Sequence, residues 1–331
     1  MMALYLPMDS VTGRRVDVDL LADYLELTAF FAVDAAARTS DLINAASLGA
    51  TEDYADLDDE MRDGAEELRA RAVNRVRSRQ DALDTEYPFR LEPGGDVLAC
   101  EPDEQSFGQA AYVLCLVLSN LMPMSQILAG SDLHPSDEEV RRLRQYFQYF
   151  ATAALAGEMH GNAWSFGFPR LDGSGFLDKL RDIWRELRDG RIERQSGAPE
   201  LPKDDQVDVF AARLHRDRLP GFLLAVGQVA TGQDAARKSL KGHVGPFKSR
   251  WFGTQPVTEF LPYMIVPFAT ADRRFVDDVR VMGNVLHRLR VPRRVAEAKR
   301  LVEAGVAIEG YDRLAEVARW VADYRGQARA A

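Results

Sequence analysis

Hydrophobic residues in the first half of the chain follow the period of the α-helix. Apolar positions recur at intervals of three and four over residues 17–48, 56–83, 106–121 and 137–155, which predicts four helices. Asp17 or Asp19 suits the N-cap of the first helix, and Ser136 opens a capping box at the last one. Turn-forming residues fill 87–95, and residues 97–100 predict one short strand.

The pattern changes in the second half of the chain. Residues 207–211 follow the two-residue period of a strand, 215–221 predict a turn, and 222–229 form a nearly unbroken apolar run typical of a buried strand. Another buried strand is predicted over 257–268. Helices are predicted over 175–189, in the basic segment after residue 233, over 272–290, from Pro292 onwards and over 308–324.

This alternation of helix and strand predicts an α/β core carried in a mainly helical protein. The chain has 331 residues, which is long enough for two domains. We expect an all-helical domain over 1–155 that serves recognition or regulation. The second domain, over 156–331, would contain the α/β core and the C-terminal helices.

Polar side chains gather at the ends of the two central predicted strands. Asp204, Asp205 and Asp208 precede or open the first strand, and Gln228 interrupts the apolar run of the second. A buried amide costs free energy unless it is bonded, so Gln228 requires a partner. Lys238 and Lys241 follow shortly afterwards. Acids, an oxygen ligand and an ammonium group are what metal-dependent phosphodiester cleavage needs, because Mg²⁺ takes few protein ligands and the ammonium stabilises the phosphorane.

The arrangement resembles the restriction-endonuclease-like superfamily, the PD-(D/E)XK nucleases. It is most similar to bacterial defence nucleases in which a D-x-G-x-D-x-x-A strand precedes Q-x-A-x-G and a lysine, and Phe166–Arg170 is reminiscent of the entry to their core. The resemblance covers about residues 160–270. The matching residues are Asp204, Asp208, Ala211, Gln228, Ala230, Gly232 and Lys238.

The chain departs from the superfamily pattern at three places. Gln228 stands where an acid is usual, Ala230 stands where a lysine is usual, and no glycine precedes the main acid. The ammonium group would therefore come from Lys238 or Lys241, or be missing.

The resemblance implies an α/β fold with a restriction-endonuclease-like mixed sheet flanked by helices, and the activity of a DNA endonuclease. Asp208, Gln228 and Lys238 would be catalytic, and Asp204, Asp208 and Gln228 would bind Mg²⁺ or Mn²⁺. Contacts to DNA would come from Lys238, Lys241, Lys248 and Arg250.

The expected role is that of an effector in bacterial antiphage defence, acting as a homo-oligomer and with a partner defence protein. The alternative is a nucleic-acid-binding or scaffold subunit whose core has lost its chemistry through Gln228 and Ala230. A structural hairpin in an unrelated α/β module, with solvated polar ends, is the third interpretation.

The net charge of −9 hides a difference between the two halves. Residues 1–150 carry 13 arginines, no lysine and 28 acids, a net charge of −15, whereas 151–331 sum to +6 and 237–300 alone to +9. A basic segment suits a phosphate backbone, and the acidic half has the charge to cover that segment in competition with DNA. Solvated charged surfaces on both halves explain the same numbers, and the arginine-rich end of 56–83 is typical of a salt-bridged surface.

Other classes of function find no support in the sequence. The two cysteines, Cys100 and Cys115, lack metal-ligand spacing, and the five histidines are scattered, so we expect no zinc site. No phosphate-binding glycine motif is present, and we expect no nucleotide cofactor. No leader pattern and no run of about 18 apolar residues occur, so we expect a soluble, cytoplasmic protein without membrane contact.

Overall fold

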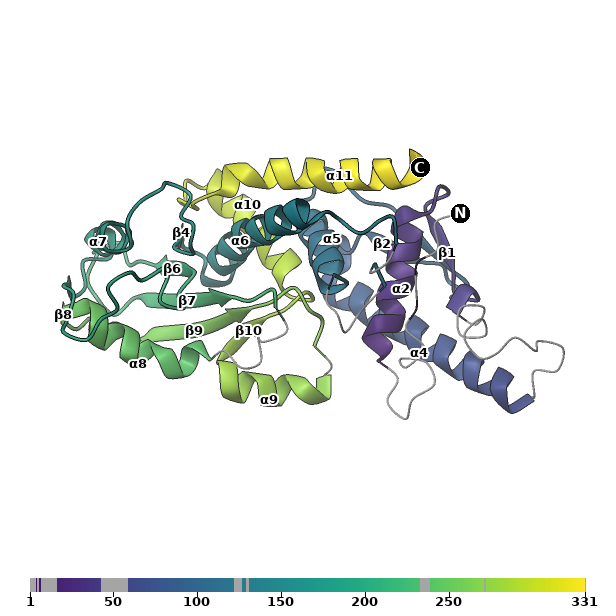
Figure 1. Cartoon of the computed structure of the whole chain (residues 1–331), viewed down its shortest axis with the longest axis horizontal. Helices are drawn as coiled ribbons and strands as arrows, with labels where there is room; N and C mark the ends of the chain where they lie inside the picture. The colour runs from purple at the N-terminus through teal and green to yellow at the C-terminus, as the bar shows by residue number, and fades with distance from the viewer. Residues whose placement is uncertain are drawn as a thin grey trace. The chain divides into compact units, whose positions relative to one another are not determined.

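The computed structural model describes residues 4, 6, 17–42, 59–121, 127–128, 131–232, 239–270 and 272–330. The chain forms two compact units (Figure 1). One consists of residues 1–141 together with 318–331, and the other of residues 142–317. The boundary predicted from the sequence lies at residue 155, and the last fourteen residues group with the first unit.

The second unit is built on a five-stranded mixed sheet. Its strands lie side by side in the order in which they occur along the chain. Neighbours are antiparallel from β4 to β7 and parallel from β7 to β10. The strands are β4 (Asn162–Ser165), β6 (Val209–Arg213), β7 (Leu223–Val229), β9 (Phe260–Ile265) and β10 (Asn284–Leu286).

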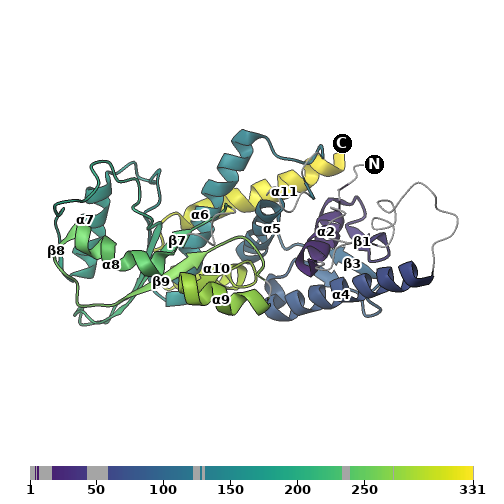
Figure 2. The ribbon, with the colours of Figure 1, turned by 60° about the horizontal axis from the view of Figure 1, so that its bottom comes forward.

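Helices cover both faces of this sheet. Phe210, Leu224 and Val226 face α7 (Phe176–Leu187) and α8 (Leu240–Trp251) in one large apolar cluster. On the other face, Gly227 leaves space for Leu155 of α6 (Asp137–Met159), since an added Cβ would lie 3.1 Å from its Cδ2. Two further helices, α9 (Asp272–Met282) beside α8 and α10 (Val291–Glu303), complete the unit (Figures 1 and 2).

Two short strands of the sheet were not predicted. The segment 162–165, for which no strand was predicted, pairs with β6 as strand β4. The helix predicted over 272–290 is wrong beyond Met282, because Gly283 takes a φ of 93° and the chain continues as β10. A two-stranded sheet of β5 (Arg191–Ile192) and β8 (Phe252–Thr254) was also not predicted.

The first unit is not all-helical as expected. Besides α2 (Val18–Phe31), α4 (Asp59–Leu83) and α5 (Phe107–Ser119), it holds an antiparallel sheet in the order β1 (Ala36–Arg38), β3 (Val97–Cys100), β2 (Phe89–Leu91). The helix predicted over 17–48 ends at Phe31, because Ala32 is extended and Ala35 has a φ of 57°. Residues 43–48 lie outside the described residues. The short strand predicted over 97–100 is confirmed.

Two 3₁₀ turns and a C-terminal helix are the remaining helical elements of the described residues. A 3₁₀ turn, η1 (Asp84–Glu86), follows α4, and another, η3 (Tyr311–Arg313), precedes the last helix, α11 (Leu314–Ala330). No helix in the described part of the chain combines the length and the hydrophobicity that a bilayer crossing requires.

A buried ionic network joins α2 to α4 in the first unit. The guanidinium of Arg79, which is 0% exposed, lies 2.7 Å from carboxylate oxygens of Asp23 and Glu26 and 2.8 Å from Asp19. Glu26 also accepts hydrogen bonds from the hydroxyls of Tyr87 and Tyr112. The arginine-rich helix thus forms ion pairs as predicted, but its central pair lies inside the unit and not at the surface.

Candidate functional site

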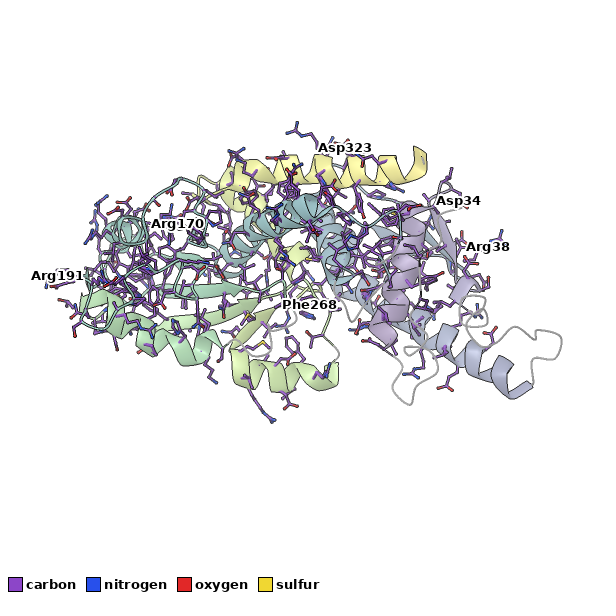
Figure 3. All side chains as sticks on the ribbon, in the orientation of Figure 1. Asp34, Arg38, Arg170, Arg191, Phe268 and Asp323 are labelled. Atoms are coloured by element: carbon purple, nitrogen blue, oxygen red, sulfur yellow. The ribbon has the colours of Figure 1, made fainter. Side chains whose placement is uncertain are left out.

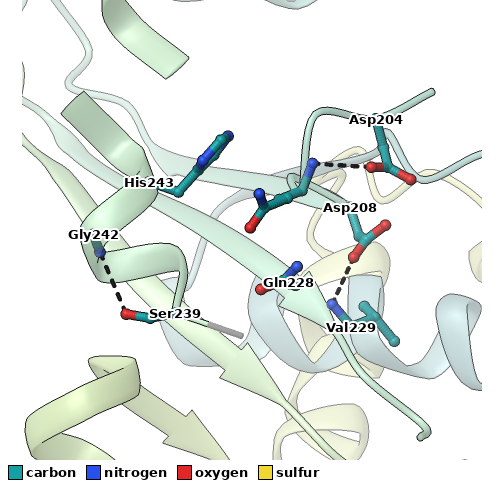
Figure 4. A pocket seen from close by; sticks show the side chains of 8 residues that line it. Asp204, Asp208, Gln228, Val229, Ser239, Gly242 and His243 are labelled. Carbon is teal, nitrogen blue, oxygen red and sulfur yellow. Dashed lines mark hydrogen bonds between the residues drawn. The ribbon is translucent and has the colours of Figure 1, made fainter. Parts of the chain in front are cut away.

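A cleft of about 720 Å³ opens where β6 and β7 meet α8 (Figure 4). Its walls are polar and come from the segment before β6, the end of β7 and the first turn of α8. The lining residues are Asp204, Gln206, Asp208, Gln228, Val229, Ser239, Gly242 and His243. Residues predicted to bind the metal therefore lie together in one cleft.

The strand register places Asp208 and Gln228 beside each other. In the antiparallel ladder Val209 pairs with Gly227, so one step further out Asp208 stands opposite Gln228. Side chains alternate between the two faces of a sheet, and both residues therefore share the face of Phe210 and Val226. Phe210 and Val226 are covered by helices, whereas the strand ends face the cleft.

Asp208 is held by its backbone and by its side chain. Its N–H donates to the Gly227 carbonyl at 2.8 Å, and its Oδ2 accepts from the Val229 N–H at 2.7 Å. Its carbonyl oxygen accepts from the amides of Phe166 and Gly167 and from Nε2 of Gln148 on α6. Such a carboxylate is preorganised for a ligand, because little of its freedom remains to be lost on binding.

Gln228 lacks the partner that its burial requires. Its side chain is 4% exposed, and its Oε1 has no hydrogen-bond partner among the described residues. A buried polar atom without a partner costs about 1–3 kcal/mol, and native proteins rarely keep one without a reason. The side chain extends into the cleft between Asp208 and Ser239 (Figure 4).

The segment before β6 contributes Asp204 and Gln206 to the lining of the cleft and places Asp205 against α8. Asp205 and Gln206 have φ values of 47° and 66°, a left-handed conformation that non-glycine residues adopt at a cost in free energy. Asp204 lines the cleft and its Oδ1 accepts from the Gln206 N–H at 2.9 Å. Arg170 supports this segment by donating to the Lys203 carbonyl, and its guanidinium carbon lies over the Phe166 ring, 4.8 Å from the ring centre.

Asp205 does not line the cleft and contacts α8 instead. Its Oδ1 accepts from Nη1 of Arg250 at 2.9 Å and its Oδ2 accepts from Nε1 of Trp251 at 2.7 Å, while Nε2 of His243 lies 3.2 Å from Oδ1. Burial raises the pKa of Asp205, but the neighbouring His243, Trp251 and Arg250 outweigh it and hold the pKa below its ordinary value. Asp205 was named only as one of the acids before the strand, and His243 was not predicted as a site residue, because no motif marks either of them.

The basic residues predicted to act on the phosphate are placed differently. Lys238 lies outside the described residues. Nζ of Lys241 donates to the Arg280 carbonyl at 3.3 Å, and Nζ of Lys248 lies 5.0 Å from the centre of the Phe260 ring. Arg250, the fourth, pairs with Asp205. No lysine or arginine of the described residues lines the cleft.

The donor atoms of the cleft suit a hard divalent cation. Two carboxylates and one amide oxygen are the oxygen ligands that Mg²⁺ prefers, and this ion keeps several waters. No group of three His, Cys, Asp or Glu side chains that could hold a metal is found among the described residues. The fit therefore depends on Gln228 as the third donor beside Asp204 and Asp208.

No protein-family model matches this chain, and no curated protein or solved structure is significantly similar to it. A function must therefore be inferred from the chemistry of the cleft.

Proposed function

We propose that this protein is a metal-dependent DNA endonuclease with a restriction-endonuclease-like core. The mixed sheet with helices on both faces supports this proposal, because restriction-endonuclease-like cores consist of a mixed sheet flanked by helices. The position of the acidic and amide side chains at the ends of adjacent strands supports it as well.

The observation that carries the proposal is the unpartnered Oε1 of Gln228, buried in a cleft that also holds the carboxylates of Asp204 and Asp208. Two carboxylates without a lysine or arginine among the described lining residues create a negative potential that favours a cation. A cation bound there would give the amide oxygen its missing partner. One ligand therefore explains both the charge of the cleft and the unsatisfied atom.

Asp204, Asp208 and Gln228 would hold Mg²⁺ or Mn²⁺ in this cleft. The bound metal would neutralise charge on the scissile phosphate and acidify water. The hydrogen bonds of Asp208 fix the carboxylate before substrate arrives, so that reorganisation costs little free energy. Arg250, Lys248 and Lys241 are the described basic residues that we assign to more distant phosphates. Lys238 keeps the catalytic role beside the scissile phosphate that the resemblance implies.

The proposed biological role rests on the sequence resemblance. We assign the protein to antiphage defence as a cytoplasmic effector, assembled as a homo-oligomer and acting with a partner defence protein. Cutting of supercoiled plasmid in a mixture with products of neighbouring genes, compared with cutting by the protein alone, would identify such a partner.

Cleavage of supercoiled plasmid by the purified protein tests the activity. We expect nicked or linear product with Mg²⁺ or Mn²⁺, none with EDTA, and none with Asp208→Asn. Asparagine at this position still offers an oxygen to the Val229 amide, so the fold is preserved. The matched control is Asp217→Asn, because exposed Asp217 likewise accepts from a backbone amide, that of Leu219. Cutting that persists both in EDTA and in Asp208→Asn would refute the proposal.

The position of Ala230 favours a second candidate, a nucleic-acid-binding subunit without cleavage activity. Ala230, at the usual lysine position, is buried in an apolar cluster, and Lys241 donates to the Arg280 carbonyl on α9. Such a subunit would bind DNA with an affinity that falls steeply with salt, because phosphate contacts release counterions. Gln228→Glu discriminates between the candidates: the binding subunit stays inert, whereas a competent site begins to cut or cuts faster.

A further inference from the structure

An aspartate and a histidine form a pair at the edge of the cleft. Nε2 of His243 lies 3.2 Å from Oδ1 of Asp205, and the two side chains are 10% and 8% exposed. His243 lines the cleft together with Asp208 and Gln228, whereas Asp205 lies behind it. We propose that His243 accepts the proton of the attacking water, with Asp205 as the residue that positions it. This inference rests on the proposed nuclease function.

Asp205 is anchored independently of the histidine. Nη1 of Arg250 donates to its Oδ1 and Nε1 of Trp251 donates to its Oδ2, and Trp251 is fully buried on α8. The left-handed backbone at Asp205 and Gln206 turns this carboxylate towards α8 while Asp204 remains in the cleft. A strained backbone held in place by such contacts is common at functional sites, because the surrounding structure must maintain it.

The position of Asp205 determines which nitrogen of His243 carries the proton. A carboxylate beside Nε2 favours a proton on that nitrogen, which leaves the lone pair on Nδ1. The distance of 3.2 Å between Nε2 and Oδ1 of Asp205 is that of an ion pair, although the two atoms do not have the geometry of a hydrogen bond. Nδ1 is therefore the atom that can accept a hydrogen bond from a molecule in the cleft.

In the proposed hydrolysis one bond to phosphorus forms and another breaks. The water oxygen forms a bond to phosphorus while its proton moves to Nδ1 of His243. The bond from phosphorus to the leaving oxygen breaks, and that oxygen keeps the electron pair and takes a proton from solvent. The imidazolium formed faces the carboxylate of Asp205, which stabilises its charge, and it then returns its proton to solvent.

A proton-accepting His243 also explains how the site could work with Ala230 at the position where the superfamily usually has lysine. Ala230 offers no group for proton transfer, and Nζ of Lys241 is bonded to the Arg280 carbonyl. Among the described residues that line the cleft, His243 is the one that carries an imidazole, the side chain that most often acts in proton transfer. General-base catalysis by a positioned side chain contributes about 10²- to 10⁴-fold to a rate.

The test compares His243→Ala with the wild type in two measurements, plasmid cleavage and Mn²⁺ binding by calorimetry. We expect cleavage to fall about 10²- to 10⁴-fold, imidazole in the buffer to restore part of it, and Mn²⁺ affinity to stay unchanged.

Asp205→Asn should lower kcat without raising KM, and imidazole should not restore its activity, because the amide favours the wrong tautomer. Asp208→Asn should lose Mn²⁺ binding, and His215→Ala, at an exposed turn, should match the wild type.

Different experimental results would overturn the role of His243 and the proposed nuclease function. A wild-type protein that cuts DNA while His243→Ala cuts equally fast would overturn the role of His243 alone. A loss of cutting that imidazole does not relieve would overturn it as well. A wild-type protein that binds Mn²⁺ and leaves DNA intact would refute both the nuclease function and the role of His243.

Discussion

Asp208 and Gln228 face each other across the ends of β6 and β7, yet only one of them has its hydrogen bonds satisfied. The Asp208 carboxylate accepts from the Val229 amide, whereas Oε1 of Gln228 has no partner among the described residues. An unpartnered buried atom is typical of a ligand site. Polar groups that all hydrogen-bond to one another inside the fold have no atom left to bind a ligand.

Replacing Gln228 with methionine should stabilise the metal-free protein. The change removes a buried oxygen that has no partner and keeps an unbranched chain of similar length, so we expect a gain of about 1–3 kcal/mol in the free energy of unfolding. Urea denaturation in EDTA measures this gain. The increase in Tm that Mn²⁺ gives the wild type should at the same time disappear.

The matched control for that variant is Gln255→Met, at an exposed position in the same unit. Its free energy of unfolding should change by less than about 0.5 kcal/mol. A Gln228→Met protein that is less stable than the wild type in EDTA, or that Mn²⁺ still stabilises fully, would contradict a ligand role for the amide.

Gly167→Ala should weaken metal binding without unfolding the protein. A Cβ at residue 167 would lie 2.9 Å from Oδ1 of Asp208 and 3.2 Å from the amide of Gln148, so both side chains must move. Displacing a metal ligand in this way typically lowers affinity by about 10- to 100-fold. Calorimetric titration with Mn²⁺ measures the loss, and circular dichroism shows whether the fold is kept.

Gly245→Ala on α8 is the corresponding control, because nothing among the described residues lies within 4 Å of its added Cβ. Its Mn²⁺ affinity should equal that of the wild type. Equal affinity in Gly167→Ala would mean that the carboxylate of Asp208 does not bind the metal.

The sequence predicted the centre of this site better than its edge. Strands β6 and β7 begin and end within a few residues of the predicted bounds, because alternation and an unbroken apolar run are local signals. Strands β4 and β10 have four and three residues, too few to show a period. Helix α8 contains Gly242, Gly245 and Pro246, residues that locally favour a turn, so its extent depends on packing against the sheet.

The pairing of Asp205 with His243 could not be predicted for a different reason. The two residues are 38 positions apart, and neither belongs to a recurring motif. Their contact requires both the left-handed turn at Asp205 and the docking of α8 by Trp251. Both are tertiary features, which no local pattern encodes.

In the first unit, Arg79→Met should be strongly destabilising. The substitution removes the guanidinium from three carboxylates and leaves Asp23 and Glu26 buried without it, so we expect a loss of about 3–5 kcal/mol. Thermal and urea denaturation measure the loss. Arg69→Met on the same helix is the control: its pairs with Glu66 and Asp96 are partly exposed, and each contributes at most about 1 kcal/mol. Equal effects of the two substitutions would exclude a special role for the buried network.

The stability of the first unit should depend on acid pH through Asp19. Burial raises the pKa of Asp19, but the charge of Arg79 and the hydrogen bond from Arg75 outweigh it and hold the pKa far below its ordinary value of 3.8. The charged carboxylate therefore stabilises the fold above pH 3.8, and this contribution declines as the pH falls towards the depressed value.

Urea denaturation at about pH 5 and about pH 2.5 measures that dependence. The loss of stability between the two values should be smaller in Asp19→Asn than in the wild type. Asp34→Asn, at an exposed loop position (Figure 3), should retain the wild-type dependence. An unchanged slope in Asp19→Asn would place the acid sensitivity elsewhere.

The cleft draws its lining residues from one uninterrupted stretch of the chain, from Asp204 to His243. A segment of 40 residues thus supplies every described side chain that lines the cleft, while more distant parts of the sequence support these residues. Substitutions that change the lining itself therefore fall within that segment, whereas substitutions elsewhere, such as Gly167→Ala, act on the lining through the scaffold. Natural descendants of this chain are in a position to gain or lose the activity by a few changes in that segment, without rebuilding the sheet.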